Sequence, residues 1–503
     1  MMIHEWGARI VKSTVRTALV ASLVVVALCG IVSVEAQTPN NGQGNSIISA
    51  QNKNTDVGNP DATANIVASY VNPAGSPADS VGGSVPPLAA AQFLSSDAGV
   101  GEAWVGSMVL YSDEQLASSA DLMWENGAHG DGKTAASYTG FGEGSDTWYL
   151  PRVVVAHGAQ VTSIALQNAD TQPVTVTIKY VYRGDATPTA VISETIETAG
   201  SRLYDLGDPG GKVPDLTTLV GQPTWEGAAV VEVEDGRVVT AMCVFHWRGF
   251  AAAYVAVPQP ALNILGPRLL RRAYDVAGEL NWAEFGNIFL QNPNDTDADV
   301  DVAFYDVSTG NLDLLLEVVV PAHRMRSINL RQGGHIPVAD LDPLDSDPGP
   351  DIVWSGKVLA TSDIPILGVV LNQRGWEVAS MYGMADTTQG SDSLYMPSVY
   401  RVLGAGAASV YSRLIVANLS DTAPMDIDWY FYDRDGNQDL VKHHTVLADG
   451  VKNLQTQLSP FTSLGNNWEG SVYVTSTGPM VGIVDTLWVA GSVRMSTYDA
   501  IGN

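Results

Sequence analysis

Cysteine is almost absent from this sequence. The chain has 503 residues and two cysteines, and the first of them, Cys29, lies in an apolar N-terminal segment. Once that segment is removed, Cys243 has no partner in the chain, so an internal disulfide is excluded and the apolar core must stabilise the fold. The neighbours of Cys243 are apolar, which is typical of a buried thiol rather than a nucleophile.

Basic residues are also scarce. Lys and Arg total 26 against 54 Asp and Glu, which gives a formal net charge of -28, and charged residues make up 16% of the chain. Proteins that bind nucleic acid neutralise its phosphates with a basic surface, so we expect no nucleic-acid partner. The acidic balance instead suits solubility and the binding of divalent cations.

Three motifs that mark common active sites are missing as well. The sequence contains no Gly-x-Ser-x-Gly, His-Glu-x-x-His or Cys-x-x-Cys, which serve nucleophilic, zinc and redox chemistry. We therefore expect a protein that is not an enzyme. Carboxylates that meet across a sheet from distant positions leave no such motif, so an assembled active site stays an open alternative.

Long apolar runs are absent except at the N-terminus. Residues 18–34 are almost entirely apolar, Arg9, Lys12 and Arg16 precede them, and small residues end at Ala36, which together are the parts of a secretory signal peptide. We interpret residues 1–36 as a signal peptide and expect a secreted protein, extracellular or at the cell surface, without membrane insertion after cleavage. A retained membrane anchor is the alternative, because the run approaches the length that spans a bilayer.

The sequence does contain a fourfold repeat. The pattern Trp-x-Gly occurs four times before a Val-rich segment, an Asn lies upstream of each copy, and a Tyr lies downstream. Three kinds of marker in a constant order predict four similar modules. The Trp-x-Gly residues are Trp104, Gly106, Trp225, Gly227, Trp354, Gly356, Trp468 and Gly470; the others are Asn52, Asn168, Asn292 and Asn418, then Tyr138, Tyr254, Tyr382 and Tyr498.

Each module has the pattern of a series of short strands. Apolar Ile427, Trp429 and Phe431 alternate with other residues in the fourth copy, as in a strand with one buried face. Gly, Pro and Asn turns separate such runs, so the sequence predicts an all-β protein of four tandem β-sandwich modules. The linkers are short, and we expect an elongated rod. The predicted modules are residues 37–146, 147–262, 263–390 and 391–503.

This pattern resembles bacterial secreted or surface proteins built from tandem immunoglobulin-like β-sandwich repeats, the kind used in extracellular fibres and adhesins. The resemblance covers residues 46–503 and is one of architecture, since no residue-level signature of a named family is matched. It implies an immunoglobulin-like fold for each module and a role at the cell surface. The last residues of the chain lack a sorting motif, so we expect any attachment to be non-covalent.

The Trp of each Trp-x-Gly is expected to fill the core between two sheets, and the Gly to let neighbouring strands approach closely. Truncating such a Trp to Ala should cost about 3 to 5 kcal/mol. The alternative is a tryptophan that faces solvent and stacks on sugar rings. That alternative motivates a second function, an extracellular adhesin or an array of polysaccharide-binding modules.

Two acidic clusters are candidate calcium sites, because calcium takes about six to eight oxygen ligands. Neither cluster has the full spacing and closing Glu of an EF-hand, and the second falls on the predicted hairpin turn of the fourth module. An ordinary polar turn is therefore the alternative, and no other cofactor is expected. The candidate ligands are Asp340, Asp342, Asp345 and Asp347 in the first cluster, and Asp433, Asp435 and Asp439 in the second.

The first module lacks an obvious first strand. Later modules begin with a proline-containing apolar segment, whereas the corresponding residues 32–39 coincide with the predicted cleavage site. An incomplete sheet edge can pair with another chain. We therefore expect a structural protein that self-associates into a cell-surface filament or layer, with module 1 of one copy packed on module 4 of the next. Local capping of the edge by residues 37–46 is the alternative.

Overall fold

In the computed structural model the chain forms β-structure almost throughout. Successive strands fall into four sets, which we call units 1 to 4, and the strands of each set pair in the same order. The described residues are 24–29, 44–100, 104–124, 134–208, 210–247, 250–276, 279–307, 309–331, 352–374, 378–404, 409–488 and 494–502.

Units 1 and 2 each contain eight strands. In the described part of the chain, the only α-helix is α2 (Leu216–Val220) of unit 2, and no helix is long and apolar enough to cross a membrane. Unit 1 comprises β1 (Val24–Cys29), β2 (Gly44–Asn52), β3 (Ala64–Val71), β4 (Pro77–Val85), β5 (Ala90–Leu94), β6 (Gly106–Ser112), β7 (Leu116–Trp124) and β8 (Thr134–Thr139). Unit 2 comprises β9 (Thr147–His157), β10 (Gln160–Asn168), β11 (Val174–Tyr182), β12 (Pro188–Ile196), β13 (Ser201–Asp205), β14 (Trp225–Val233), β15 (Val239–Trp247) and β16 (Phe250–Val255).

Units 3 and 4 repeat this series with longer strands. One continuous strand in each, β22 or β30, takes the places of both the sixth and the seventh strands. Unit 3 comprises β17 (Ala261–Val276), β18 (Glu279–Gln291), β19 (Ala298–Asp306), β20 (Leu312–Val320), β21 (Met325–Asn329), β22 (Ile352–Arg374), β23 (Val378–Gly383) and β24 (Ala385–Asp386). Unit 4 comprises β25 (Ser391–Val402), β26 (Val410–Asn418), β27 (Met425–Asp433), β28 (Gln438–Val446), β29 (Val451–Gln455), β30 (Asn467–Trp488), β31 (Arg494–Asp499) and β32 (Ile501–Gly502).

The strand pairs are antiparallel; unit 1 contains two four-stranded sheets, whereas units 2, 3 and 4 each contain one eight-stranded sheet. In unit 1 the orders are β1-β6-β3-β4 and β5-β2-β7-β8. In unit 3 the first part of β22 pairs with β17 and β19, and the second part pairs with β18 and β23. In unit 3 this long strand therefore joins the groups of strands that form separate sheets in unit 1 into one sheet.

Apolar side chains at alternate positions of the strands fill the core of each unit. Along β27, Met425, Ile427, Trp429 and Phe431 are buried while residues between them are half-buried or exposed, because successive side chains of a strand point to opposite faces. The prediction of an all-β fold is confirmed. In unit 1 the first two strands, β1 and β2, belong to different sheets, whereas in constant-type immunoglobulin domains they share a sheet. In units 2, 3 and 4 the first two strands are neighbours in one sheet.

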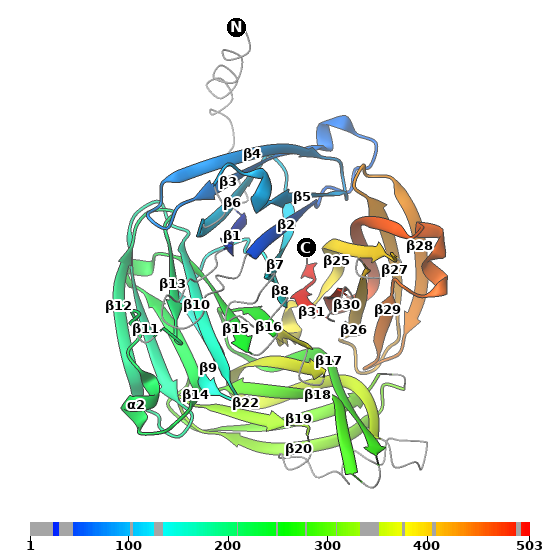
Figure 1. The fold of residues 1–503 in the computed structure, drawn as a ribbon. Helices are drawn as coiled ribbons and strands as arrows, with labels where there is room; N and C mark the ends of the chain where they lie inside the picture. The colour runs from blue at the N-terminus through cyan, green and yellow to red at the C-terminus, as the bar shows by residue number, and fades with distance from the viewer. Residues whose placement is uncertain are drawn as a thin grey trace, which may run out of the picture.

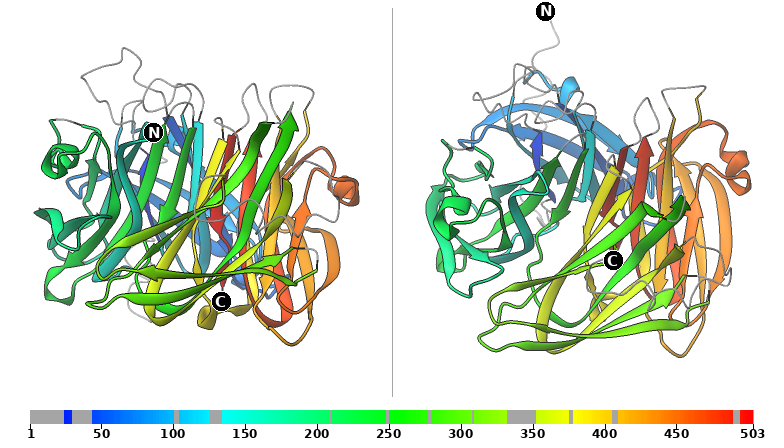
Figure 2. Two further views of the ribbon diagram at one scale, coloured as in Figure 1. Left: turned by 90° about the horizontal axis from the view of Figure 1, so that it is seen from below. Right: turned by 60° about the horizontal axis from the view of Figure 1, so that its bottom comes forward.

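The four units form a ring (Figures 1 and 2). β8, β16, β23 and β31 lie around its centre, and each packs against at least two others of this group. β4, β12, β20 and β28 lie at the periphery. The chain therefore places the last strand of every unit at the centre and the fourth strand outside.

The elongated rod expected from the short linkers is not observed, because unit 4 lies against unit 1. Leu88 and Ala117 of unit 1 form a buried cluster with Tyr395 and Tyr432 of unit 4. Removing such apolar surface from water favours closure. Short linkers constrain the spacing of units but not the direction in which each unit turns, and the turns here accumulate into a closed ring.

A first strand is present in unit 1, upstream of the expected position. β1 pairs antiparallel with β6, with Val24 opposite Leu110 and Val26 opposite Met108, as β9 pairs with β14 in unit 2. The copy expected at residues 32–39 lies outside the described residues. Because β1 belongs to the predicted signal peptide, cleavage after Ala36 would remove this partner of β6.

Candidate functional site at the centre of the ring

The Trp-x-Gly residues begin the sixth strand of each unit. A Cβ added to Gly227 would lie 2.0 Å from the Val181 carbonyl oxygen of β11 and 2.8 Å from the Trp225 ring. The other three glycines meet the same two obstacles, so only glycine permits this approach of strand and ring. The buried rings are those of Trp225, Trp354 and Trp468, and the half-buried ring is that of Trp104.

Each of these indoles donates its N–H to an acceptor near the outer edge of the unit. The rings thereby connect the sixth strand to the fourth strand or to the turn before it, and the buried rings present no free face to a sugar. The pairs are Trp104 with Asn72 Oδ1 (2.9 Å), Trp225 with Thr189 Oγ1 (3.4 Å), Trp354 with Asp313 Oδ2 (3.1 Å) and Trp468 with Asp439 Oδ2 (2.7 Å).

The recurring Asn ends the second strand of each unit and bridges two turns. Asn168 Nδ2 donates to the carbonyl oxygens of Gln172 (2.7 Å) and Glu197 (3.0 Å), and its Oδ1 accepts the N–H of Asp170 (2.7 Å). The side chain thus satisfies backbone groups that the turns leave without sheet partners. Asn52, Asn292 and Asn418 make corresponding bonds.

In units 2, 3 and 4 the recurring Tyr lies on the central strand and holds it to the first strand of the same unit. The hydroxyl of Tyr254 donates to the Arg152 carbonyl oxygen (2.9 Å), and that of Tyr498 donates to the Ser398 carbonyl oxygen (2.8 Å). Both acceptors directly follow the proline of the first strand, where the strand register shifts. Tyr382 bonds Arg268 in the same way in unit 3.

The acidic turn that begins at Asp433 has partners within the protein. Asp433 accepts the backbone N–H groups of Asp435 (3.0 Å) and Asn437 (2.8 Å), and Asp439 accepts the Trp468 indole. No group of three or more His, Cys, Asp or Glu side chains that could hold a metal ion occurs among the described residues. Calcium at this turn stays a prediction. The other candidates, Asp340, Asp342, Asp345 and Asp347, lie outside the described residues.

The turn at Asp433 is also a contact between units. A Cβ added to Gly436 would lie 2.9 Å from Pro86 of unit 1. The turn between the third and fourth strands contacts the following unit at the other junctions too. Those contacts join Pro73 to Ser201 (3.1 Å, carbonyl to N–H), Gly184 to Arg324 (3.4 Å, carbonyl to Nη1) and Gly310 to the Ala448 carbonyl.

A buried carboxyl group lies where unit 4 meets unit 1. Asp121 of β7 accepts hydrogen bonds from Ser137 of unit 1 and from Ser398 (3.3 Å) and Tyr400 (3.3 Å) of unit 4. Burial raises the pKa of Asp121 to about 6, although the three hydroxyl donors oppose the rise. The junction that closes the ring therefore contains a titratable group.

The junction between units 3 and 4 uses different chemistry. Arg268 of unit 3 forms a buried ion pair with Asp485 of unit 4. Asp485 faces Thr497 across the sheet as Asp121 faces Ser137, so the two carboxyls occupy equivalent positions. Units 2 and 3 have Val244 and Leu371 at this position. Different side chains at equivalent junctions favour one order of units around the ring.

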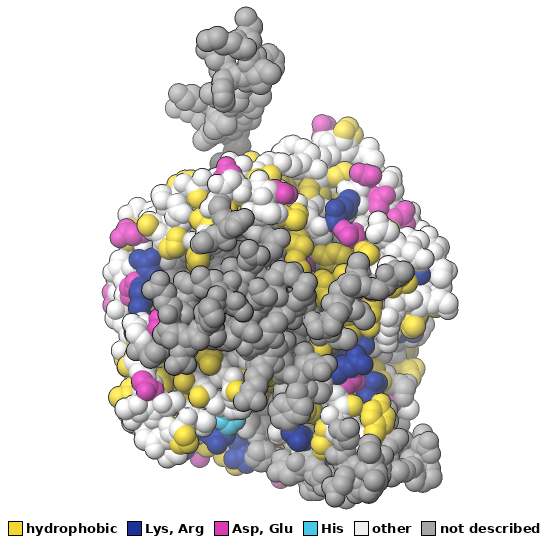
Figure 3. All heavy atoms as spheres, viewed as in Figure 1, with side chains coloured by type: hydrophobic (Ala, Val, Ile, Leu, Met, Phe, Trp, Pro, Cys, Tyr) yellow, Lys and Arg dark blue, Asp and Glu magenta, His cyan; other side chains and the backbone are white. Residues whose placement is uncertain are grey.

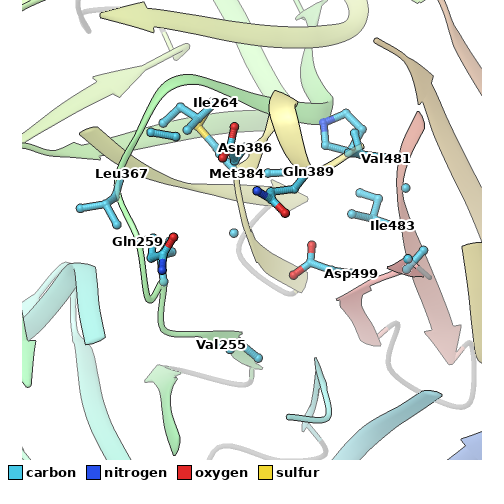
Figure 4. Close-up of a pocket in the computed structure, with 18 of the residues that line it drawn as sticks. Val255, Gln259, Ile264, Leu367, Met384, Asp386, Gln389, Val481, Ile483 and Asp499 are labelled. Atoms are coloured by element: carbon cyan, nitrogen blue, oxygen red, sulfur yellow. The ribbon is translucent and has the colours of Figure 1, made fainter. Parts of the chain in front are cut away.

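A cavity of about 460 Å³ lies where the chain leaves the central strands of units 2, 3 and 4 (Figure 4). Its polar lining includes Gln259, Asp386, Gln389 and Asp499. Asp386 accepts the N–H of Thr388 (2.9 Å) and so has a partner. The apolar lining includes Ile264, Leu367, Met384, Leu394, Met480 and Ile483.

Asp499 is the distinctive polar group of this cavity. Among the described residues, no hydrogen-bond donor contacts its carboxylate, although its backbone carbonyl accepts from Thr139 of unit 1 (2.8 Å). Enclosure by the protein raises the pKa of Asp499 to about 7, while the side chain keeps a partly exposed surface. Sequence analysis did not identify it; the only signal is an Asp directly after the repeated Tyr498.

No family model matches the chain, and no curated protein matches it. Three solved structures are distantly similar. The crystal structure of Thermotoga maritima 1070 is 17% identical in sequence to this chain. The match covers 23% of this chain and 97% of that chain, with a TM-score of 0.20. A tetra-tandem repeat in the extending region of a large adhesion protein is 12% identical. The match covers 88% of this chain and 92% of that chain, with a TM-score of 0.10. The pilus backbone protein of Streptococcus pneumoniae is 7% identical. The match covers 77% of this chain and 86% of that chain, with a TM-score of 0.11. TM-scores this low support no argument about function.

Proposed function

We propose that this chain is an exported, non-enzymatic structural protein of the cell surface, in which each molecule is a four-unit ring and rings associate side by side. The observation that carries the proposal is the outer edge of unit 3. Among the described strands, β20 pairs with β19 alone, so the backbone groups along its other side have no strand partner.

The β20 edge is unusually apolar. Its sequence is Leu-Asp-Leu-Leu-Leu-Glu-Val-Val-Val, and Leu312, Leu315 and Val319 are about half exposed, at 51%, 50% and 48%. The corresponding strand of unit 1 is Pro-Ala-Asp-Ser-Val-Gly-Gly-Ser-Val. A long apolar edge strand is a template for pairing with another chain, and a second copy of β20 offers a matching antiparallel edge with two-fold symmetry.

Closure of the ring blocks the self-association that the sequence predicted, in which module 1 of one copy packs on module 4 of the next. The surface of unit 4 that was expected to receive unit 1 of another copy already holds unit 1 of the same molecule, through contacts such as Ser471 Oγ donating to the Leu88 carbonyl oxygen (2.6 Å). A side-by-side assembly through the periphery leaves all four junctions intact. Two-fold pairing through β20 alone joins two rings into a closed dimer, and growth of a layer or a filament would need a further contact between such dimers.

A nucleic-acid partner remains disfavoured by the charge balance. On the face shown in Figure 3, Lys and Arg side chains are scattered in small groups rather than gathered in one patch. Phosphate binding depends on many such groups acting together. The proposed partners are therefore other copies of this chain.

A second candidate function is filament growth by strand addition at unit 1. β1 lies within the predicted signal peptide, so removal of residues 1–36 would leave one side of β6 without a strand. A strand from another copy could then occupy that position. An adhesin or polysaccharide-binding array stays a third hypothesis, but the burial of three of the four repeated tryptophans gives it little support.

Substitutions on two outer strands separate these possibilities. Residues 37–503 would be compared by sedimentation velocity and negative-stain electron microscopy with Leu315→Lys and Val319→Lys variants. We expect the parent chain to associate as its concentration rises and the β20 variants to remain single rings, since a lysine on an edge strand opposes pairing with another strand. Val191→Lys on β12, where Val191 is 58% exposed, is the matched control and should associate like the parent.

Two outcomes argue against lateral pairing. A parent chain that stays a single ring at every concentration contradicts self-association. Filaments that persist in the β20 variants but disappear when residues 1–36 are restored support strand addition at unit 1 instead.

A further inference from the structure

We propose that the cavity beside Asp499 binds a small organic cation, a molecule with an apolar body and a protonated amine directed at the Asp499 carboxylate. This site is independent of lateral association, because its lining comes from the inner parts of units 2, 3 and 4 and not from the outer β20 edge.

The charge of the ligand follows from the polar groups present. No Lys or Arg is among the lining residues, and no donor in the described part of the chain contacts the Asp499 carboxylate. An enclosed carboxylate without a partner is costly, and a nearby cation relieves that cost. An ammonium group also supplies the hydrogen bonds that the carboxylate lacks.

The apolar lining and the volume of the cavity indicate the size and character of the uncharged part of the ligand. Ile264, Met384 and Met480 bring apolar side chains from units 3 and 4 to the cavity, and the unbranched methionines can adjust to different shapes. A volume of about 460 Å³ lies toward the lower end of the range of small-molecule pockets. These dimensions favour a single ring or a short branched chain over an oligosaccharide.

The polar rim gives the amine a second set of partners. Gln259 and Gln389 are exposed at the cavity, and Figure 4 shows Gln389 next to Asp499 and Gln259 on the opposite side of the view. A carboxamide oxygen accepts N–H donors from an ammonium group. Asp386 contributes less, because Thr388 already occupies its carboxylate.

Three probes of similar shape test the proposal. 2-Phenylethylamine, 2-phenylethanol and 3-phenylpropanoate would be titrated into the purified chain by calorimetry at about pH 8, where both the carboxyl and the amine are ionised. We expect the amine to bind about tenfold or more tightly than the alcohol, and the anion to bind weakest. In the Asp499→Asn variant the preference for the amine over the alcohol should disappear.

Two further variants locate the effect. Gln259→Trp at the exposed rim should weaken the binding of both the amine and the alcohol by partly filling the mouth. Asp435→Asn, on an exposed turn of unit 4, should bind like the parent. Equal affinity for amine and alcohol, unchanged amine binding in Asp499→Asn, or no saturable binding of any probe would each overturn the proposal. Rings that stay single in sedimentation would leave this result unaffected.

Discussion

At the residue scale, the four repeated glycines solve the same steric problem. The Trp two residues before each glycine folds its ring back over that glycine, and a carbonyl oxygen of the third strand lies on the other side. For Gly470 that oxygen belongs to Tyr432, 2.0 Å from the position of a Cβ. The Trp and the Gly therefore recur together because the ring occupies the volume that a side chain on the glycine would need.

This packing makes a specific prediction for Gly227→Ala. The new methyl group would clash with the Val181 carbonyl and the Trp225 ring, so β11 and β14 must separate, and we expect a loss of about 1 to 3 kcal/mol in the free energy of unfolding. Thermal and denaturant unfolding measure it. Gly142→Ala is the control, since a Cβ there meets nothing within 4 Å; equal stability of the two variants would contradict the steric explanation.

At the element scale, β1 and β6 distinguish unit 1 from the other units. The first strands β9, β17 and β25 belong to the body of the chain, whereas β1 belongs to the predicted signal peptide. Cleavage of the predicted signal peptide would therefore remove the first strand of unit 1, whereas units 2, 3 and 4 would keep theirs. The sequence indicated a gap in unit 1, and the structure shows which residues occupy it.

Hydrogen exchange tests the dependence of β6 on β1. In residues 37–503 the amides of β6 that face β1, around Met108 to Leu110, should exchange faster than in the full-length chain, because they lose their strand partner. The amides of β14, around Val230, should exchange at the same rate in both proteins. Equal protection of β6 in both would mean that another segment, such as residues 37–46, covers this edge.

At the scale of the whole molecule, closure of the ring depends on polar groups that belong to distant parts of the sequence. Asp121 is buried among hydroxyls of unit 1 and unit 4, and its pKa in the folded protein, about 6, lies above its value in an unfolded chain. The ionised carboxylate is therefore the less favourable form in the folded state. The stabilising contribution of this group is complete below about pH 4 and is lost as pH rises to about 6.

The Asp121→Asn variant should remove this pH dependence. Between about pH 4 and pH 7 we expect the variant to gain on the order of 2 to 3 kcal/mol relative to the wild type, because a shift of one pKa unit corresponds to about 1.4 kcal/mol. Calorimetric unfolding across this range measures the difference. Parallel pH profiles would mean that Asp121 does not titrate in the ring. Asp435→Asn, at an exposed carboxyl, is the control.

Part of the fold could be predicted from short-range patterns. The alternation in β27 and the Gly and Asn turns act within a few residues, so they are visible in the sequence, and they led to the all-β prediction. The strand order was less predictable, because the pairing of β1 with β6 and of β2 with β7 depends on contacts between residues far apart in the chain. None of the cavity residues was predicted, since they come together from three units.

The sequence by itself determined that the chain is all-β and that Trp-x-Gly, Asn and Tyr recur in order, because periodicity, turn chemistry and local packing are properties of neighbouring residues. Only the tertiary structure decided that the units close into a ring, that Asp121 and Arg268 lie at different junctions, and that Asp499 faces an apolar cavity. These features depend on the angle at which one unit meets the next. The rotations at the four junctions must add up to one full turn, and no local pattern encodes their sum.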